Sequence, residues 1–131
     1  MKKTLLLFAI ILSCLSCEKD YLIPDDEVPG WLKNKISQDE ATIRSDPKLM
    51  PNYGAWIRYE FRGDRYYEYD NPLSSTSRNP YSESGVRINT TVAPYTNYRD
   101  DKCCEKFVWK APNYQMAWST DTDQQYRHRK N

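Results

Sequence analysis

The sequence predicts a small α+β domain, with one or two N-terminal helices packed on an antiparallel sheet of four or five strands. Three observations support this fold class. Residues 29–45 have a helical apolar spacing, residues 54–69 alternate in polarity as a β-hairpin does, and shorter alternating segments follow towards the C-terminus. Because a lone hairpin is marginal in water, we expect the helical segment to cover one face of the sheet.

The helical segment carries a short apolar stripe. Leu32 and Ile36 lie four residues apart, and Trp31 lies beside them. Residues 37–40, Ser-Gln-Asp-Glu, also match a capping box, which is typical of a helix N-terminus. The segment therefore forms either one helix or two helices bent at Ser37.

Residues 54–69 give the clearest strand signal in the chain. Between residues 55 and 61, apolar side chains occupy alternate positions, so one face of this strand is apolar and the other is mixed. Residues 62–64 supply a turn and residues 65–69 return, which predicts a hairpin.

The rest of the domain is predicted to contain a long loop, three further strands and a frayed tail. Alternating apolar residues mark the strands, whereas the loop and the tail have no periodicity. The loop spans residues 71–85, the strands span 86–90, 105–110 and 114–119, a polar turn spans 94–102, and the tail spans 120–131.

The aromatic content allows two interpretations. The chain has eleven tyrosines and four tryptophans. A core built from such residues must satisfy their hydroxyl and indole groups, so the rings would lie at the boundary between interior and water. Alternatively, some rings form an exposed platform for a sugar or a peptide. The candidate binding surface consists of Trp56, Tyr66, Trp109 and Trp118.

The N-terminus has the pattern of an export signal. Lys2 and Lys3 precede an apolar run at residues 5–12, which is too short to span a bilayer because that takes roughly 20 residues. Leu-Ser-Cys at residues 15–17 forms a small-residue cleavage site. The arrangement resembles a bacterial lipoprotein signal, which implies that Cys17 is acylated, for example with palmitate, and becomes the mature N-terminus. The alternative is a cleaved secretory signal with incidental cysteines.

This resemblance implies a division of the chain and a location. Residues 1–16 would be the signal peptide and 17–28 an acylated tether, while the polarity pattern places the domain at 29–119 and a flexible tail at 120–131. The charged residues after Cys17 resemble the export tags of Bacteroidota surface lipoproteins, so we expect a cell-envelope protein held in the outer membrane by its acyl chains. Removing Lys2 and Lys3 from the 19 basic residues leaves 17 against 18 acidic ones, so no net charge favours nucleic acid.

Cys103 and Cys104 are adjacent, and three interpretations of the pair stay open. Neighbouring Cα atoms lie about 3.8 Å apart, below the roughly 4.4–6.8 Å usual for a disulfide. The pair is therefore two buried thiols beside a strand, a strained vicinal disulfide that acts as a stiff turn or redox switch, or a pair that binds a soft metal or a partner. His128 is the sole histidine, so a zinc site of four ligands is not predicted.

No catalytic residue and no cofactor is predicted. Carboxylate pairs such as Glu60 and Glu68, which a hydrolase would use, can oppose each other across the hairpin, but like charges in such positions are usually solvated. A single histidine leaves no base that can be assigned to a serine or cysteine nucleophile.

The chain also resembles a group of small, uncharacterised Bacteroidota lipoproteins, in which a helix, an aromatic hairpin and a Cys-Cys pair follow one another. The matching residues are Pro29, Trp31, Leu32, Lys35, Ile36, Tyr59, Phe61, Gly63, Tyr66, Tyr67, Cys103 and Cys104. In that group the cysteine pair follows the hairpin closely, whereas residues 71–102 intervene here. The expected function is non-enzymatic binding of a protein or glycan partner at the envelope. A small hydrolase and an inhibitor or immunity lipoprotein are the alternatives.

Overall fold

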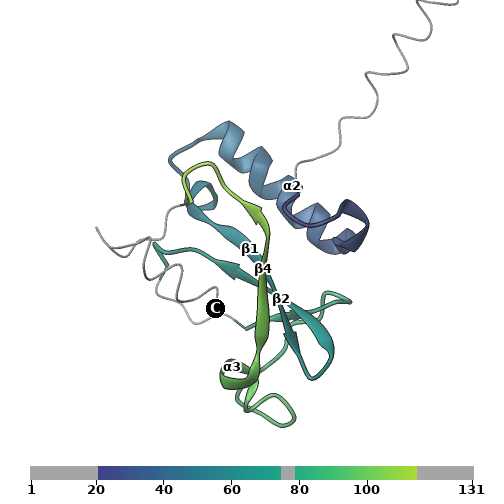
Figure 1. The fold of residues 1–131 in the computed structure, drawn as a ribbon. Coiled ribbons are helices and arrows are strands. Elements are labelled where there is room, and N and C mark those ends of the chain that lie inside the picture. The colour runs from purple at the N-terminus through teal and green to yellow at the C-terminus, as the bar shows by residue number, and fades with distance from the viewer. Residues whose placement is uncertain (1–20, 75–78, 115–131) are drawn as a thin grey trace, which may run out of the picture.

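The computed structural model describes residues 21–74 and 79–114 and has one main helix over a four-stranded antiparallel sheet (Figure 1). The strand order is β3-β2-β1-β4. The elements are η2 (Asp25–Glu27), α2 (Gly30–Ser45), η3 (Met50–Tyr53), β1 (Ala55–Phe61), β2 (Asp64–Asp70), β3 (Tyr81–Ser82), α3 (Tyr98–Asp101) and β4 (Cys103–Lys110). The predicted α+β class is confirmed.

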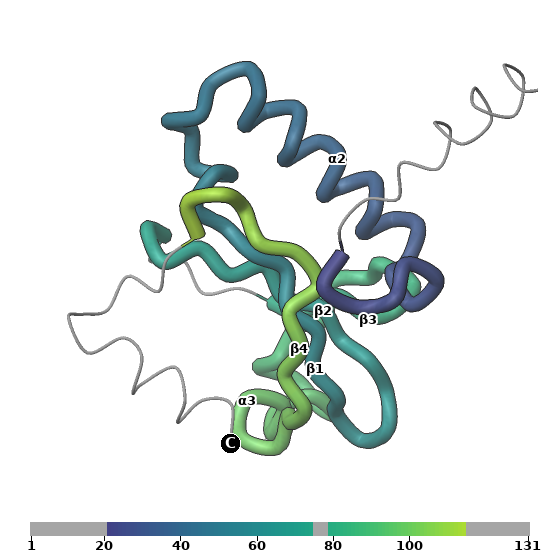
Figure 2. Tube along the Cα trace, turned by 45° about the horizontal axis from the view of Figure 1, so that its top comes forward, coloured from purple at the N-terminus to yellow at the C-terminus, as the bar shows by residue number. Residues whose placement is uncertain are grey.

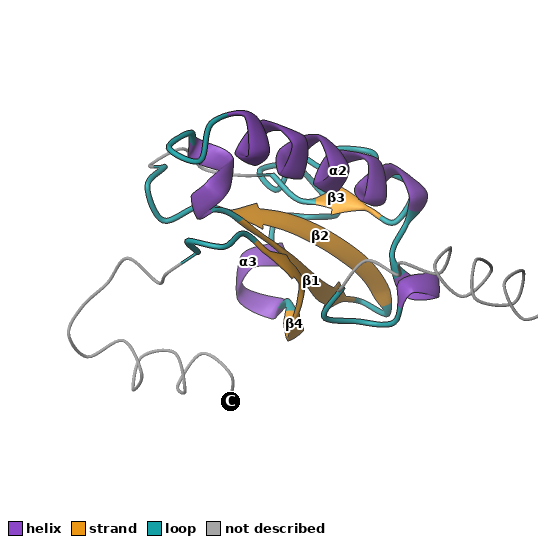
Figure 3. Cartoon of the chain, turned by 90° about the horizontal axis from the view of Figure 1, so that it is seen from above, coloured by secondary structure: helices purple, strands orange, loops and turns teal. Residues whose placement is uncertain are grey.

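Helix α2 is one continuous helix and covers one face of the sheet (Figure 3). Pro29 is its N-cap residue, and the carbonyl of Pro29 accepts hydrogen bonds from the backbone N–H groups of Leu32 and Lys33. Leu32 and Ile36 are fully buried. The predicted alternative of two helices bent at Ser37 is wrong, because one continuous helix runs through Ser37 and the second capping signal starts no new helix.

Strands β1 and β2 form the predicted hairpin. Phe61 pairs with Asp64, so the loop has only two residues, Arg62 and Gly63. Both have positive φ angles, 51° and 83°, which is the backbone of a type I′ turn. This turn matches the right-handed twist of the strands, and glycine adopts its second position without steric cost.

The two faces of the sheet hold separate aromatic cores. On the α2 side, Trp31 makes edge-on contacts with Trp56 and Tyr67, whose ring centroids lie 6.0 and 5.9 Å from that of Trp31. On the opposite side, Phe61 and Tyr66 pack with Ile88, Tyr95 and Tyr98. The rings face inwards on both sides because alternate residues of a strand point to opposite faces.

Residues 21–28 belong to the packed domain. The backbone N–H of Leu22 donates to the carbonyl of Val108 on β4, and Ile23 and Val28 are buried in the core under α2. The carboxylate of Glu27 also pairs with the buried Arg58 at 2.7 Å. The predicted tether of residues 17–28 is therefore too long at its C-terminal end, and residues 17–20 lie outside the described part of the chain.

The predictions beyond the hairpin are partly wrong. Residues 86–90 form no strand: Arg87 makes one isolated bridge to Tyr81, while β3 lies in the predicted loop. Gly85, with a φ of +86°, turns the chain between them. Strand β4 confirms the strand predicted at 105–110 and begins two residues earlier.

The structure also bears on the predicted polar turn at 94–102 and the predicted strand at 114–119. The predicted polar turn at 94–102 contains the short helix α3. In the predicted strand 114–119 only Tyr114 is described, and it is not in a strand. Residues 115–119 and the predicted tail lie outside the described residues.

The buried stripe of α2 should dominate the stability of the domain. Ile36→Ala is expected to lower the free energy of unfolding by about 2–5 kcal/mol, because it leaves a cavity against the sheet. Gln38→Ala, an exposed change on the same helix, should stay within about 0.5 kcal/mol of the wild type. Urea denaturation followed by circular dichroism measures both, and equal losses would contradict the packing described here.

Candidate functional site

The aromatic residues predicted to form a binding surface are core residues. Trp56, Tyr66 and Trp109 are only 4%, 6% and 7% exposed. Trp56 lies opposite Trp109 in the sheet, and Tyr66 packs with Tyr98 in the second core. The prediction of a surface at these three rings is wrong, because two packed layers cover the two faces of the sheet; Trp118 lies outside the described residues.

The carboxylate pair considered for a hydrolase is separated by the sheet. Glu60 pairs with Arg65 in the register of the hairpin, and Glu68 pairs with Ile57. Since neighbouring positions alternate between faces, Glu60 and Glu68 point to opposite sides. They cannot act on one substrate, and the proposed opposition of the two carboxylates is wrong.

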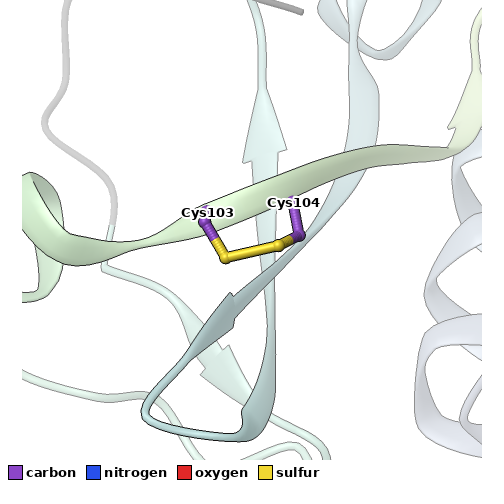
Figure 4. The surroundings of a disulfide bond; sticks show 2 residues. All are labelled: Cys103 and Cys104. Carbon is purple, nitrogen blue, oxygen red and sulfur yellow. A yellow bond between two sulfur atoms is a disulfide. The ribbon is translucent and has the colours of Figure 1, made fainter. Parts of the chain in front are cut away.

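Cys103 and Cys104 form a vicinal disulfide at the start of β4 (Figure 4). Their Cα atoms are 3.8 Å apart, and both residues are exposed. Of the three interpretations of the pair, the one with two buried thiols is wrong, because the cysteines are bonded to each other and exposed. The start of β4 lies beside the β1–β2 hairpin, and α3 lies at the same end of the sheet (Figures 1 and 2).

The disulfide coincides with a β-bulge. Arg58 pairs with Lys106, whereas Glu60 pairs with Cys103, so Tyr59 alone faces two residues of β4, Cys104 and Glu105. Cys104 has a φ of 64°, a left-handed conformation that a glycine adopts easily and that costs other residues about 1–2 kcal/mol. The chain thus holds a strained residue at an exposed position.

The residues on both sides of the disulfide are tied to the hairpin. Before it, the ammonium group of Lys102 pairs with the carboxylate of Glu68 and lies 3.8 Å from the ring centroid of Tyr59. After it, the carboxylate of Glu105 accepts a hydrogen bond of 3.0 Å from the hydroxyl of Tyr59. Burial, and then the negative charge of Glu105, raise the pKa of Tyr59, so its hydroxyl remains a donor at neutral pH. We call this set of Tyr59, Glu68, Lys102 and Glu105 the bulge clamp.

The geometry brings Glu60 to the disulfide. One carboxylate oxygen of Glu60 and the Sγ atoms of Cys103 and Cys104 all lie within 4.8 Å of one another. Among the described residues, no other group of three or more His, Cys, Asp and Glu side chains is close enough to hold a metal ion. Glu60 reaches this place because it pairs with Cys103 across the β1–β4 ladder.

The bulge clamp is the part of the site that the sequence did not predict. Lys102 and Glu68 are 34 residues apart, and Tyr59 and Glu105 are 46 residues apart. No local spacing relates residues this far apart. The one local signal is that Lys102 and Glu105 directly flank the cysteine pair.

The remaining surface of the described residues has few large apolar groups and no exposed ring. Every aromatic side chain in residues 21–74 and 79–114 is buried or half-buried. The exposed large apolar residues are Leu22, Leu49, Met50, Leu73, Val86 and Val92. In these same ranges the structure has no helix that is long and apolar enough to cross a membrane.

Comparisons of the chain with protein-family models, with curated proteins and with solved structures gave no match.

Breaking the clamp at Lys102 should destabilise the domain. Lys102→Met leaves the carboxylate of Glu68, whose side chain is 12% exposed, without its cation, at an expected cost of about 2–3 kcal/mol. Adding Glu68→Met should restore at least half of that loss, because no unpaired charge remains. Urea denaturation of the two single variants and the double variant measures this coupling; additive losses would show that the two side chains are independent.

The backbone at residue 104 can be tested without the disulfide. Cys103→Ser with Cys104→Gly should be more stable than Cys103→Ser with Cys104→Ser, by about 0.5–1 kcal/mol. Glycine relieves the left-handed strain but gains more freedom in the unfolded chain, so the advantage is smaller than the full strain. Thermal unfolding compares the two variants. A serine variant of equal or greater stability would mean that the bulge does not persist without the disulfide.

Proposed function

We propose that the protein is a lipid-anchored protein of the cell envelope that binds a protein partner without catalysing a reaction. The observation that carries the proposal is the exposed, strained backbone at Cys104, held from both sides by the bulge clamp. Strained backbone persists only where the surrounding structure enforces it, and it gathers at functional sites. The binding surface is therefore proposed to include the disulfide.

A protein partner fits the described surface better than a glycan does. A glycan site of the kind predicted from the sequence needs aromatic rings that are exposed at the surface. Trp56, Tyr66 and Trp109 are buried. The end of the sheet with the disulfide instead offers exposed residues at the hairpin tip, 62–64. Such a surface suits a folded protein, which can match a rigid, irregular edge.

The anchor is proposed from the N-terminal pattern and Cys17. The hydrolase alternative loses its carboxylate pair, since Glu60 and Glu68 lie on opposite faces. An inhibitor or immunity lipoprotein is one form of protein binding, and the experiment below also addresses it.

The anchor can be tested by growing cells with an alkyne-tagged fatty acid. The wild-type protein is expected to incorporate the label and to sediment with membranes, whereas Cys17→Ala should do neither. Labelling of the Cys17→Ala variant, or no labelling of the wild type, would contradict acylation at this residue.

The binding surface can be tested by photo-crosslinking in intact cells. A photoreactive residue replaces either Lys106, which is exposed on β4 beside the bulge, or Lys48, which is exposed in the loop after α2. We expect a covalent adduct with one protein from position 106 and none from position 48. Equal adducts from both positions, no adduct, or an adduct with a glycan would each overturn the proposal of a protein partner at the bulge.

A further inference from the structure

Three groups that can bind a metal ion meet at the start of β4. These are the sulfur atoms of Cys103 and Cys104 and the carboxylate of Glu60, all within 4.8 Å of one another. We propose that reduction of the disulfide creates a site for one thiophilic divalent cation, with two thiolates and Glu60 as ligands. This inference does not depend on the proposed function.

The dimensions of the site suit such an ion. In a tetrahedral zinc site, Zn–S distances of about 2.3 Å place two sulfur atoms about 3.8 Å apart. Two adjacent cysteines can reach this separation once the S–S bond is broken, since each side chain then rotates freely about its own Cα–Cβ bond. Both cysteines are exposed, so the fourth position is open to water.

The third ligand is held by the sheet. Glu60 lies on β1, the central partner of β2 and β4, and pairs with Cys103 in the register. Lys102 and Glu105 fix the chain on either side of the cysteines through the bulge clamp. The carboxylate and the thiols therefore stay close together whether or not the sulfur atoms are bonded to each other.

The neighbouring charges do not remove the carboxylate from the site. Arg65 lies opposite Glu60 in the register of β1 and β2. The guanidinium of Arg65 also lies 3.9 Å from the carboxylate of Glu83, which offers it a second anion. A divalent cation bound by two thiolates and Glu60 carries a formal charge of −1 with its ligands, so Arg65 would remain a favourable neighbour.

The conversion requires a reductant, which we take to be a protein or small-molecule dithiol. The dithiol transfers two electrons and two protons to the S–S bond, yields two cysteine thiols and becomes a disulfide itself. The cation then displaces the two thiol protons to solvent. Thiolate ligands select soft ions such as Zn²⁺ or Cd²⁺, whereas Mg²⁺ and Ca²⁺ prefer oxygen ligands.

The test uses the full chain in detergent with Cys14→Ser and Cys17→Ser, so that Cys103 and Cys104 are the only thiols. The protein is reduced with a phosphine, which does not compete for the metal as a dithiol would, and is titrated with Cd²⁺. Thiolate-to-cadmium absorption and calorimetry should show one ion bound per chain. The oxidised chain should give no such absorption, and Mg²⁺ should not compete.

Two matched variants test whether the carboxylate of Glu60 is a ligand of the ion. Glu60→Gln should weaken Cd²⁺ binding at least tenfold, because it removes one of three protein ligands. Asp101→Asn, an exposed change two residues before Cys103, should bind as the parent chain does. Unchanged affinity in Glu60→Gln would overturn the three-ligand site.

Three further results would also overturn the proposal. These are equal binding by the oxidised chain, one ion shared between two chains in sedimentation experiments, and loss of the native circular dichroism spectrum on reduction. The last result would mean that the disulfide is needed to hold Glu60 beside the cysteines.

Discussion

The pairing of β1 with two neighbours is the constraint on which the rest of the structure depends. Strands β2 and β4 bind its two edges, and its alternate side chains serve both cores. Trp56 faces α2, while Phe61 faces the layer of Ile88 and Tyr98. Both cores combine aromatic rings with aliphatic side chains, and a sheet covered on both sides buries them together.

Local sequence patterns were sufficient to predict the helix and the hairpin. The four-residue spacing of Leu32 and Ile36 and the alternation along β1 are direct consequences of helix and strand periodicity. The later elements depend on contacts that local patterns do not encode. Residues 86–90 alternate like a strand, yet Ile88 packs in the second core and, within this segment, only Arg87 makes a bridge.

The loop length of the hairpin explains the error over Glu60 and Glu68. A three-residue turn at 62–64 would have placed both carboxylates on one face. The observed loop has two residues, and a shift of one residue in register moves a side chain to the other face. The sequence did indicate the adjacent cysteine pair as a candidate site, but the contacts of Tyr59 and Lys102 around it are with segments distant in the chain.

The packing of residues 21–28 limits how far Cys17 can lie from the domain. Tyr21 is already part of the domain, in contact with the core under α2. If Cys17 carries the acyl chains, only residues 18–20 separate it from Tyr21, and these four Cα–Cα steps span about 14 Å when fully extended. The edge of β4, where Leu22 is bound to Val108, would then rest close to the lipid headgroups. With such an anchor, a partner held in the same membrane would meet the disulfide at a high effective concentration.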